Sequence, residues 1–179
     1  MLETPRSSAT VSSDESHRRD LPEGGAGAVD ALRVARGIAR LFARNGIWCL
    51  PEMPLRNGRR ADLMGIDPKG CVIIVEIKVS RADLLGDCKW ADYLAYCDRF
   101  YWGLPPTLCR GPLDDAAFLP ERCGTIVSDG YDAEIVRPAA SVPLAPARRR
   151  KEVERLARTA MRRLCFAADP SCAEHGETG

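Results

Sequence analysis

The chain has 179 residues, of which 45% are hydrophobic, and its formal net charge is +1. This length and hydrophobic content suit one globular domain and leave too little chain for two comfortable ones. The chain has neither a run of 18 uncharged apolar residues nor an N-terminal apolar stretch of signal-peptide length, so no membrane span or secretion is expected, and the predicted location is the cytoplasm.

Several common kinds of site are not expected from the residue types present. The two histidines, His17 and His175, lie in segments that resemble disordered tails, which argues against histidine-based catalysis. The glycine-rich motifs of P-loop and dinucleotide-binding proteins are missing. None of the eight cysteines falls in C-x-x-C spacing, and several lie inside apolar patterns, so all are expected to be reduced thiols.

The predicted organisation is one domain, residues 28–168, between two disordered tails. Residues 1–27 are rich in Ser, Gly and charge and poor in large apolar groups, so they cannot bury enough surface to fold. Residues 169–179 are assigned to the second tail. Apolar residues recur at helical spacing from Val29 to Asn45, and Gly46 is a natural stop, so the first helix is predicted there.

The next segments predict a mixed sheet. Residues 47–54, 59–66 and 71–79 read as three antiparallel strands in a meander. A helix over residues 80–96 and a strand over residues 98–104 follow. Because a strand, helix, strand unit of this length joins parallel strands, the fourth strand should lie beside the third.

The chain then predicts a hairpin and a last long helix. The hairpin spans residues 125–128 and 133–136 around Asp129-Gly130, and the helix spans residues 147–168. The apolar stripe of this helix comprises Val153, Leu156, Ala160, Met161 and Leu164. Trp90, Tyr93 and Tyr96, at helical spacing, are expected to pack in the core, with base stacking as the alternative.

The turn between the second and third strands sets their register. Pro68 and Lys69 suit a type I turn, and Gly70 suits the left-handed position that follows, which gives a three-residue loop with a G1 bulge. This register places Asp62 opposite Glu76. A two-residue loop would instead send Glu76 to the other face, because side chains alternate along a strand.

Opposed carboxylates destabilise a sheet unless a positive charge neutralises them, so Asp62 and Glu76 predict a Mg²⁺ or Mn²⁺ site. Lys78 lies on the same face as Glu76, where its ammonium can offset charge on a phosphoryl group. The alternative is a solvated salt-bridge cluster that includes Arg60. The metal site is favoured because Glu76 and Lys78 interrupt an otherwise apolar strand, residues 71–79.

The order of elements, with Asp on the second strand and Glu-x-Lys on the third, resembles the PD-(D/E)XK nuclease superfamily. Within it, PEMPLRNGRRADLMGID and VIIVEIKVSRADLLGDCKWADYLAYCDRFYWGLP resemble the MmcB-like DNA-repair family. The resemblance implies an α/β restriction-endonuclease-like core, with Asp62 and Glu76 as metal ligands and Lys78 as the motif lysine. Ala61 departs from the pattern, because many superfamily members have Pro before the acid.

Two further residues are secondary candidates for the site. Lys89, on the following helix, is either a phosphate-proximal auxiliary or a lysine that extends from an amphipathic helix to solvent. Glu52 is either a third metal ligand, in place of the first-helix glutamate of some relatives, or a surface side chain. The basic residues expected to contact DNA are Arg59, Arg60, Arg148, Lys151, Arg155, Arg158 and Arg162.

The function predicted from these features is a metal-dependent DNA nuclease that acts in DNA repair, with DNA and other DNA-repair proteins as partners. Its first alternative is a non-catalytic DNA-binding repair accessory factor that keeps the fold and uses the charged cluster structurally. A protein-interaction module is the third interpretation, which requires the arginines of the last helix to be irrelevant to DNA binding.

Overall fold

The computed structural model describes residues 30–175. The predicted N-terminal tail, together with His17, lies outside the described residues. The segment assigned to the C-terminal tail begins with a short 3-10 helix, Pro170–His175, and residues 176–179 lie outside the description.

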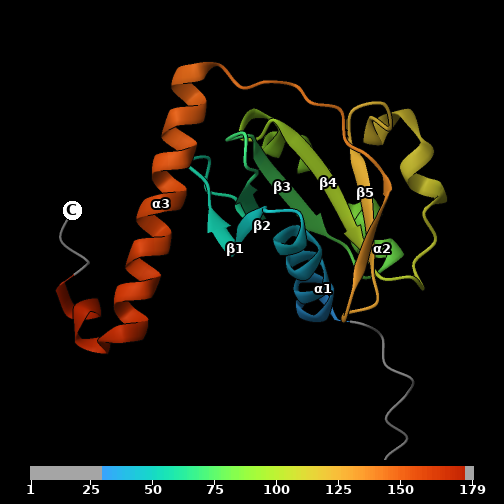
Figure 1. The fold of residues 1–179 in the computed structure, drawn as a ribbon. Coiled ribbons are helices and arrows are strands. Elements are labelled where there is room, and N and C mark those ends of the chain that lie inside the picture. The colour runs from blue at the N-terminus through green and yellow to red at the C-terminus, as the bar shows by residue number, and fades with distance from the viewer. Residues whose placement is uncertain (1–29, 176–179) are drawn as a thin grey trace, which may run out of the picture.

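A six-stranded mixed sheet forms the centre of the molecule, with its strands in chain order β1-β2-β3-β4-β5-β6 (Figure 1). The strands are β1 (Trp48–Pro54), β2 (Arg60–Ile66), β3 (Val72–Ile77), β4 (Arg99–Leu104), β5 (Gly124–Ser128) and β6 (Ala133–Arg137). The meander β1-β2-β3 is antiparallel, β4 lies parallel to β3, and β5-β6 is an antiparallel hairpin. The predicted mixed α/β sheet is therefore confirmed.

The β2-β3 turn has the predicted register. Met64 pairs with Ile74, and the backbone N–H of Asp67 donates to the carbonyl of Cys71. Gly70 has a φ of +78°, the left-handed conformation that the G1 bulge requires and that favours glycine. Local turn chemistry therefore decides which side chains of β2 and β3 oppose each other.

Helix α1 (Ala31–Arg44) covers one face of the sheet. Its N-terminus is capped by Asp30, whose carboxylate accepts the N–H of Arg33 at 2.7 Å. The buried residues Val34, Ile38 and Phe42 follow helical spacing and pack on the odd-numbered residues of β3. This face therefore holds a purely apolar cluster and contributes no candidate site residue.

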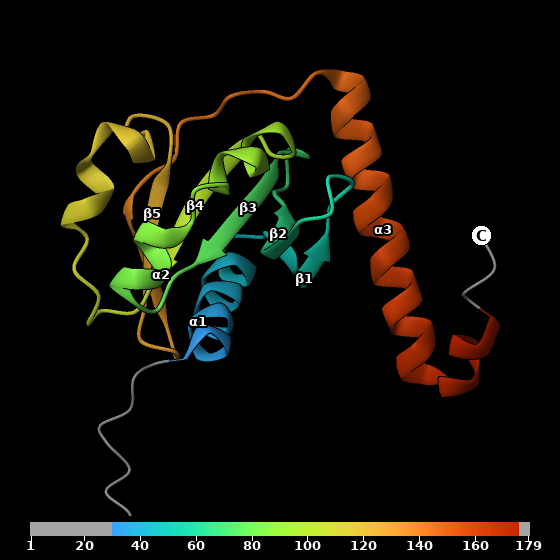
Figure 2. The ribbon, with the colours of Figure 1, turned by 180° about the vertical axis from the view of Figure 1, so that it is seen from behind.

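Aromatic side chains dominate the opposite face of the sheet, which is turned away from the viewer in Figure 1 and toward the viewer in Figure 2. Trp90 lies 5.6 Å from Phe100 and 5.2 Å from Trp102, measured between ring centroids. Tyr93 stacks on Phe100 at 6.2 Å, and all four rings are buried. Trp90, Tyr93 and Tyr96 are thus core residues, as predicted.

The helix predicted over residues 80–96 is interrupted, and in this respect the prediction was wrong. The structure has a short helix α2 (Arg81–Gly86), a bend at Asp87 and a 3-10 helix η1 (Trp90–Ala95). In the structure, η1 buries Trp90 and Tyr93, and the carboxylate of Asp87 forms an ion pair with Lys78. A single straight helix over this segment is inconsistent with both contacts. Tertiary contacts therefore override the helical spacing of the aromatic residues.

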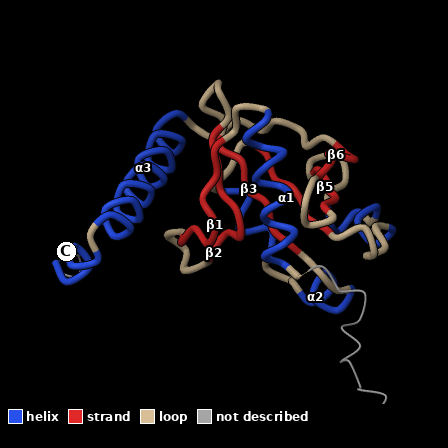
Figure 3. Tube along the Cα trace, turned by 60° about the horizontal axis from the view of Figure 1, so that its bottom comes forward, coloured by secondary structure: helices blue, strands red, loops and turns tan. Residues whose placement is uncertain are grey.

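The last helix, α3 (Pro146–Ala168), runs beside β1 and then projects from the body of the molecule (Figures 1 and 3). Of its predicted apolar stripe, Leu156 is buried, whereas Met161 and Leu164 are 64% and 69% exposed. Only the first part of the stripe therefore packs on the sheet. No helix among residues 30–175 combines the length and hydropathy needed to cross a membrane.

Asp98 fastens the start of α3 to the sheet. Its carboxylate is 2% exposed and accepts the backbone N–H groups of Val72 and Leu144, each at 2.7 Å. Arg149 of α3 donates to the same carboxylate at 2.5 Å. Burial acts to raise the pKa of Asp98, but these hydrogen bonds outweigh it and lower that pKa below its ordinary value.

Asp98→Ala is expected to lower the free energy of unfolding by about 3 kcal/mol, because it leaves two buried N–H groups and a guanidinium without their acceptor. Thermal unfolding followed by circular dichroism measures this loss. Glu121→Ala, at an exposed carboxylate that makes no ion pair with a described residue, is the matched control and should change stability by less than about 0.5 kcal/mol. Equal effects of the two substitutions would contradict the assignment.

Candidate active site

Two charged side chains lie on a strand that is otherwise buried and apolar. Glu76 is on β3, and Lys78 follows the strand by one residue; each is only 6% exposed. Lys78 Nζ lies 3.5 Å from Glu76 Oε1. The other carboxylate oxygen, Oε2, is buried and has no hydrogen-bond partner among the described residues. Such a group is costly to bury, which makes this charged pair the candidate site.

Asp62 of β2 joins this pair from the neighbouring strand. Its Oδ2 accepts the backbone N–H of Ile77 at 2.7 Å, which holds the carboxylate beside the end of β3. The structure thus brings Asp62, Glu76 and Lys78 together, as the turn register predicted.

The pKa values of both acids respond to burial and to each other. Burial, and then the negative charge of Asp62, raises the pKa of Glu76 to about 8, although Lys78 acts to lower it. Burial likewise raises the pKa of Asp62 above its ordinary value, against the opposing effects of the Ile77 N–H and Lys78. Two acids in this arrangement favour a proton or a cation between them.

The sequence analysis missed the strongest partners of Lys78, which are two aspartates of the α2 segment. Nζ of Lys78 lies 2.8 Å from Asp87 Oδ2 and 3.5 Å from Asp83 Oδ1. Burial acts to lower the pKa of Lys78, but the hydrogen bond to Asp87 and the charge of Glu76 outweigh burial and raise it. Lys78 is therefore a fixed cation. The four-residue spacing of these aspartates was the only signal available in the sequence.

Tyr93 contributes a hydroxyl that the sequence analysis assigned only to packing. Its O–H donates to the backbone carbonyl of Arg60 at 3.0 Å. Burial, and then the charges of Glu76 and Asp62, raises the pKa of Tyr93 above its ordinary value, so the hydroxyl stays protonated next to the acids. Tyr93 therefore connects the aromatic core to the carboxylate pair.

Glu52 lies beside Asp62 on the edge strand β1, in an unusual backbone conformation. Its φ is +53°, which is strained for a residue with a side chain. Its carboxylate forms an ion pair with Arg60 and is half exposed, and its charge contributes to the raised pKa of Asp62. Among residues 30–175, no group of three or more Asp, Glu, His or Cys side chains is arranged to hold a metal ion.

Other predicted site residues lie further from the cluster. Lys89 is exposed and has no ion pair with a described residue. Arg59 pairs with Asp92 at 2.8 Å. Neither side chain is in contact with Glu76 or Lys78 through any hydrogen bond of the described part of the chain.

The five basic residues of α3 that were predicted to contact DNA divide into two groups. Arg148 and Arg155 turn inward: both pair with the fully buried Glu152, and their guanidinium carbons lie 4.3 and 5.6 Å from the ring centroid of Tyr96. They anchor the helix, which is not the role that the sequence analysis expected for them. The outward group comprises Lys151, Arg158 and Arg162, which are exposed and form no ion pair with any of residues 30–175.

Comparison with known proteins assigns the chain to a family. Residues 20–171 match the family described as DNA repair protein MmcB-like. The chain belongs to the MmcB-like family. A solved structure, the SPO1766 protein of unknown function from Silicibacter pomeroyi, is 42% identical to it, with a TM-score of 0.68. The similarity covers 78% of this chain and 91% of that one. No curated protein matches the chain.

Membership of the MmcB-like family indicates a role in DNA repair, for which DNA is a suitable partner. The match includes every residue of the Asp62, Glu76 and Lys78 cluster, together with Asp83, Asp87 and Tyr93. In this MmcB-like protein the cluster therefore offers two acidic oxygen donors, a fixed ammonium and a protonated phenol within one buried corner of the sheet.

Proposed function

We propose that this MmcB-like protein is a metal-dependent DNA nuclease with a restriction-endonuclease-like core. One observation carries the proposal: a buried carboxyl oxygen of Glu76 has no hydrogen-bond partner in the described part of the chain and lies beside a second acid, Asp62, and a fixed ammonium, Lys78. A structural salt bridge gives no reason for the unpaired oxygen. A cation bound beside it would satisfy it, and that cation could in turn bind a phosphate oxygen.

Asp62 and Glu76 fit a magnesium or manganese ion. Such ions take one or two protein carboxylates and fill their other positions with water and phosphate oxygens, so a third acidic ligand is not required. Glu52 is the third candidate, since its charge acts on Asp62, but it first has to leave Arg60. A bound divalent ion supplies polarisation of a phosphodiester and a lowered pKa for an attacking water.

The protein side chains have separate roles in this chemistry. Lys78 keeps its proton because Asp87 and Glu76 stabilise the ammonium, so it offsets negative charge on the phosphoryl group and does not act as a base. Asp87 positions that ammonium at 2.8 Å. Tyr93 holds the start of β2 through the Arg60 carbonyl and thereby fixes the strand that carries Asp62.

The experiment that tests the proposal compares wild type with Glu76→Ala on single-stranded, duplex and branched DNA, with magnesium, manganese or EDTA. Cleavage by wild type that requires the metal and is lost in the variant supports the nuclease. If neither protein cleaves DNA and both bind it equally, the function is a non-catalytic one.

A non-catalytic DNA-binding repair accessory factor is the second candidate, and one observation favours it. Lys78 is already neutralised by aspartates of the α2 segment, as in a structural cluster. In this function the sheet is a scaffold and α3 supplies the DNA contacts. DNA binding without cleavage, unchanged by Glu76→Ala, is its expected behaviour.

DNA contact is expected from the outward basic residues of α3. Replacing Lys151, Arg158 and Arg162 together by alanine should weaken DNA binding by about 10-fold or more at 0.1 M salt, because each exposed cation that meets a phosphate releases counterions. Fluorescence anisotropy with a labelled duplex at several salt concentrations measures both the affinity and its salt dependence, which should become shallower.

Arg33→Ala, Arg36→Ala and Lys69→Ala combined are the matched control, since they remove three exposed cations outside α3. A loss of affinity as large as that of the α3 variant would show that net charge alone matters and would contradict a DNA-binding role for the helix.

A further inference from the structure

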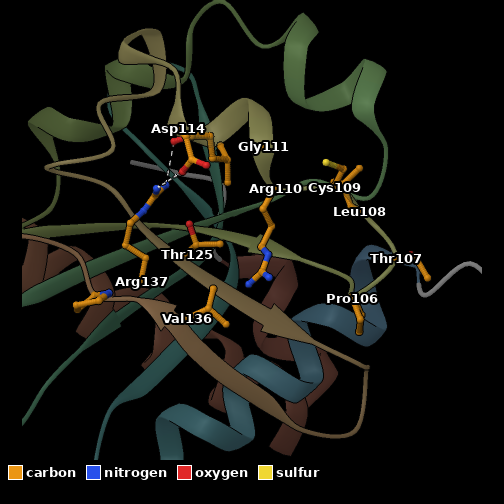
Figure 4. A pocket seen from close by; sticks show the side chains of 12 residues that line it. Pro106, Thr107, Leu108, Cys109, Arg110, Gly111, Asp114, Thr125, Val136 and Arg137 are labelled. Atoms are coloured by element: carbon orange, nitrogen blue, oxygen red, sulfur yellow. Dashed lines mark hydrogen bonds and ion pairs between the residues drawn. The ribbon is translucent and has the colours of Figure 1, made fainter.

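A cavity of about 740 Å³ lies apart from the Asp62, Glu76 and Lys78 cluster, at the other end of the sheet. The segment that follows β4, residues 106–114, covers it, and Thr125 of β5 with Val136 and Arg137 of β6 lies beneath that segment (Figure 4). Cavities of roughly 300 to 1,000 Å³ are typical of sites for small organic ligands. The volume therefore suits one small molecule or one unit of a polymer.

The cavity contains one positive charge that the protein does not neutralise. Arg137 Nη1 pairs with Asp114 at 2.9 Å, and its Nη2 donates to the carbonyl of Leu113 at 3.0 Å. Arg110 forms no ion pair with any of residues 30–175, and Figure 4 shows its side chain extending from the covering segment toward the strands. The lining thus holds two guanidinium groups and one carboxylate, which gives a net charge of about +1 in the cavity at neutral pH.

Polar groups on the strands also lack partners. Thr125 is 2% exposed, lies directly opposite Arg137 in the β5-β6 pair, and has no side-chain hydrogen bond to a described residue. The Nε of Arg137 is buried and has no acceptor there either. A buried donor such as this Nε is normally satisfied, so an oxygen-rich ligand would complete it.

Apolar side chains complete the lining. Three apolar residues border the cavity: Leu113 is buried, Leu108 is partly buried, and Val136 is 38% exposed. They offer a dry surface for a flat or apolar part of a ligand. The cavity therefore combines an anion-binding group with an apolar wall.

A neighbouring cavity shares Arg110 and is lined by three acids, two of which already have partners. Asp132 forms an ion pair with Arg44, and Asp129 accepts the N–H groups of Tyr131 and Asp132, both at 2.7 Å. Glu134, the remaining acid, is not within ion-pair distance of Arg110. The positive charge of Arg110 is therefore available to a ligand.

We propose that this cavity binds one nucleotide unit, with its phosphate on Arg110 and Thr125 and its base against Leu108 and Val136. A phosphodiester carries one negative charge, which matches the one unneutralised positive charge. A further cavity of about 750 Å³ shares Cys109 and Gly111 with this one and extends to Asp87, the partner of Lys78. This second cavity gives a route from the nucleotide site to Asp87, and Asp62, Glu76 and Lys78 are not among its lining residues.

The choice of a nucleotide rests on the DNA-repair family and on this route, and it does not require cleavage. The nucleotide unit belongs either to a DNA strand or to a free deoxynucleotide, because both present phosphate oxygens and a base, as a phosphodiester in a strand and as a phosphomonoester in the free nucleotide. Binding measurements on the whole chain distinguish a DNA strand from a free deoxynucleotide. They also distinguish failure of this proposal from failure of the nuclease proposal, because Glu76→Ala leaves the proposed nucleotide site intact.

Isothermal titration calorimetry with dAMP, with deoxyadenosine and with a short single-stranded oligodeoxynucleotide tests the proposal. Wild type should bind dAMP about 10-fold or more tightly than deoxyadenosine, and Arg110→Ala should weaken dAMP binding by at least about 10-fold. Arg36→Ala, which removes one exposed cation from α1, should bind like wild type. Val136→Asp, at an exposed position, should abolish binding through charge repulsion.

Either source of the nucleotide supports the site, and the oligonucleotide decides between them. Tighter binding of the oligonucleotide, also lost in Arg110→Ala, assigns the site to a DNA strand, whereas equal binding of dAMP assigns it to a free nucleotide. Any of three results overturns the proposal. The first is that neither dAMP nor the oligonucleotide binds, and the second is that dAMP and deoxyadenosine bind with equal affinity. The third is that Arg110→Ala and Arg36→Ala lose the same affinity for dAMP.

Discussion

Glu76→Ala is expected to abolish metal-dependent cleavage of DNA, with a loss of about 10²- to 10³-fold or more in rate. The carboxylate of Glu76 lies beside Asp62 at the end of β3, and its buried Oε2 has no hydrogen-bond partner among the described residues. Removing it leaves Asp62 as the remaining acid of the proposed pair, which weakens binding of a divalent ion and no longer fixes its position. The measurement is the initial rate of cleavage of labelled DNA in magnesium or manganese, with EDTA as the blank.

Asp62→Ala should have the same effect, because the two acids act as a unit. Glu121→Ala, at an exposed carboxylate away from the cluster, is the matched control and should cleave at the wild-type rate. Circular dichroism and DNA affinity should be unchanged in all three variants. Cleavage that persists in Glu76→Ala, or in EDTA, would show that the cluster is not the catalytic centre.

Glu76→Gln is expected to stabilise the metal-free protein at high pH. A carboxyl whose pKa rises from 4.5 to about 8 on folding keeps its proton in the folded state while the unfolded chain releases it. The folded state then binds more protons, so stability falls as pH rises between these values. The accumulated penalty is on the order of 4 kcal/mol above pH 8, and it is absent below pH 4.5, where both states are protonated.

Urea denaturation from pH 4.5 to 8.5 in EDTA measures this difference. Wild type should lose stability across the range relative to Glu76→Gln, and the two proteins should be alike at its acidic end. Magnesium or manganese should raise the midpoint of wild type at pH 8 but not that of Glu76→Gln, because the ion replaces the proton. Parallel pH profiles in EDTA would contradict the raised pKa of Glu76 and the burial that causes it.

The central pair of the site could be predicted from the sequence because its geometry is local. The Asp67 to Gly70 turn leaves few alternatives for the loop, and Gly70 adopts the left-handed φ of +78° that the predicted bulge requires. Strand periodicity then carries this register back to Asp62 and Glu76, as the Met64 to Ile74 pairing confirms.

The partners of Lys78 could not be predicted in the same way. Helical spacing favoured one continuous helix over residues 80–96, whereas the chain bends at Asp87 to bury Trp90 and Tyr93 and to place the Asp87 carboxylate on the ammonium. The energy that decides this bend comes from aromatic packing on β4 and from a buried charge. Both are contacts with residues distant from the bend in the sequence.

The direction in which the basic side chains of α3 turn is a second feature that could not be predicted from the sequence. Its arginines recur at three- and four-residue steps, from which the sequence predicts a helix but not the direction in which each side chain turns. The buried carboxylate of Glu152 draws Arg148 and Arg155 inward and leaves Lys151, Arg158 and Arg162 in solvent.

By itself, therefore, the sequence determined the strands, the hairpin register and the acid pair, because turns and period-two alternation depend on near neighbours. Tertiary structure alone decided that Lys78 is fixed by Asp87, that Tyr93 reaches the site, and that Arg110 lines a separate cavity. These features depend on burial, which turns a charge without a nearby partner into a large energetic cost and is known only once distant segments have packed.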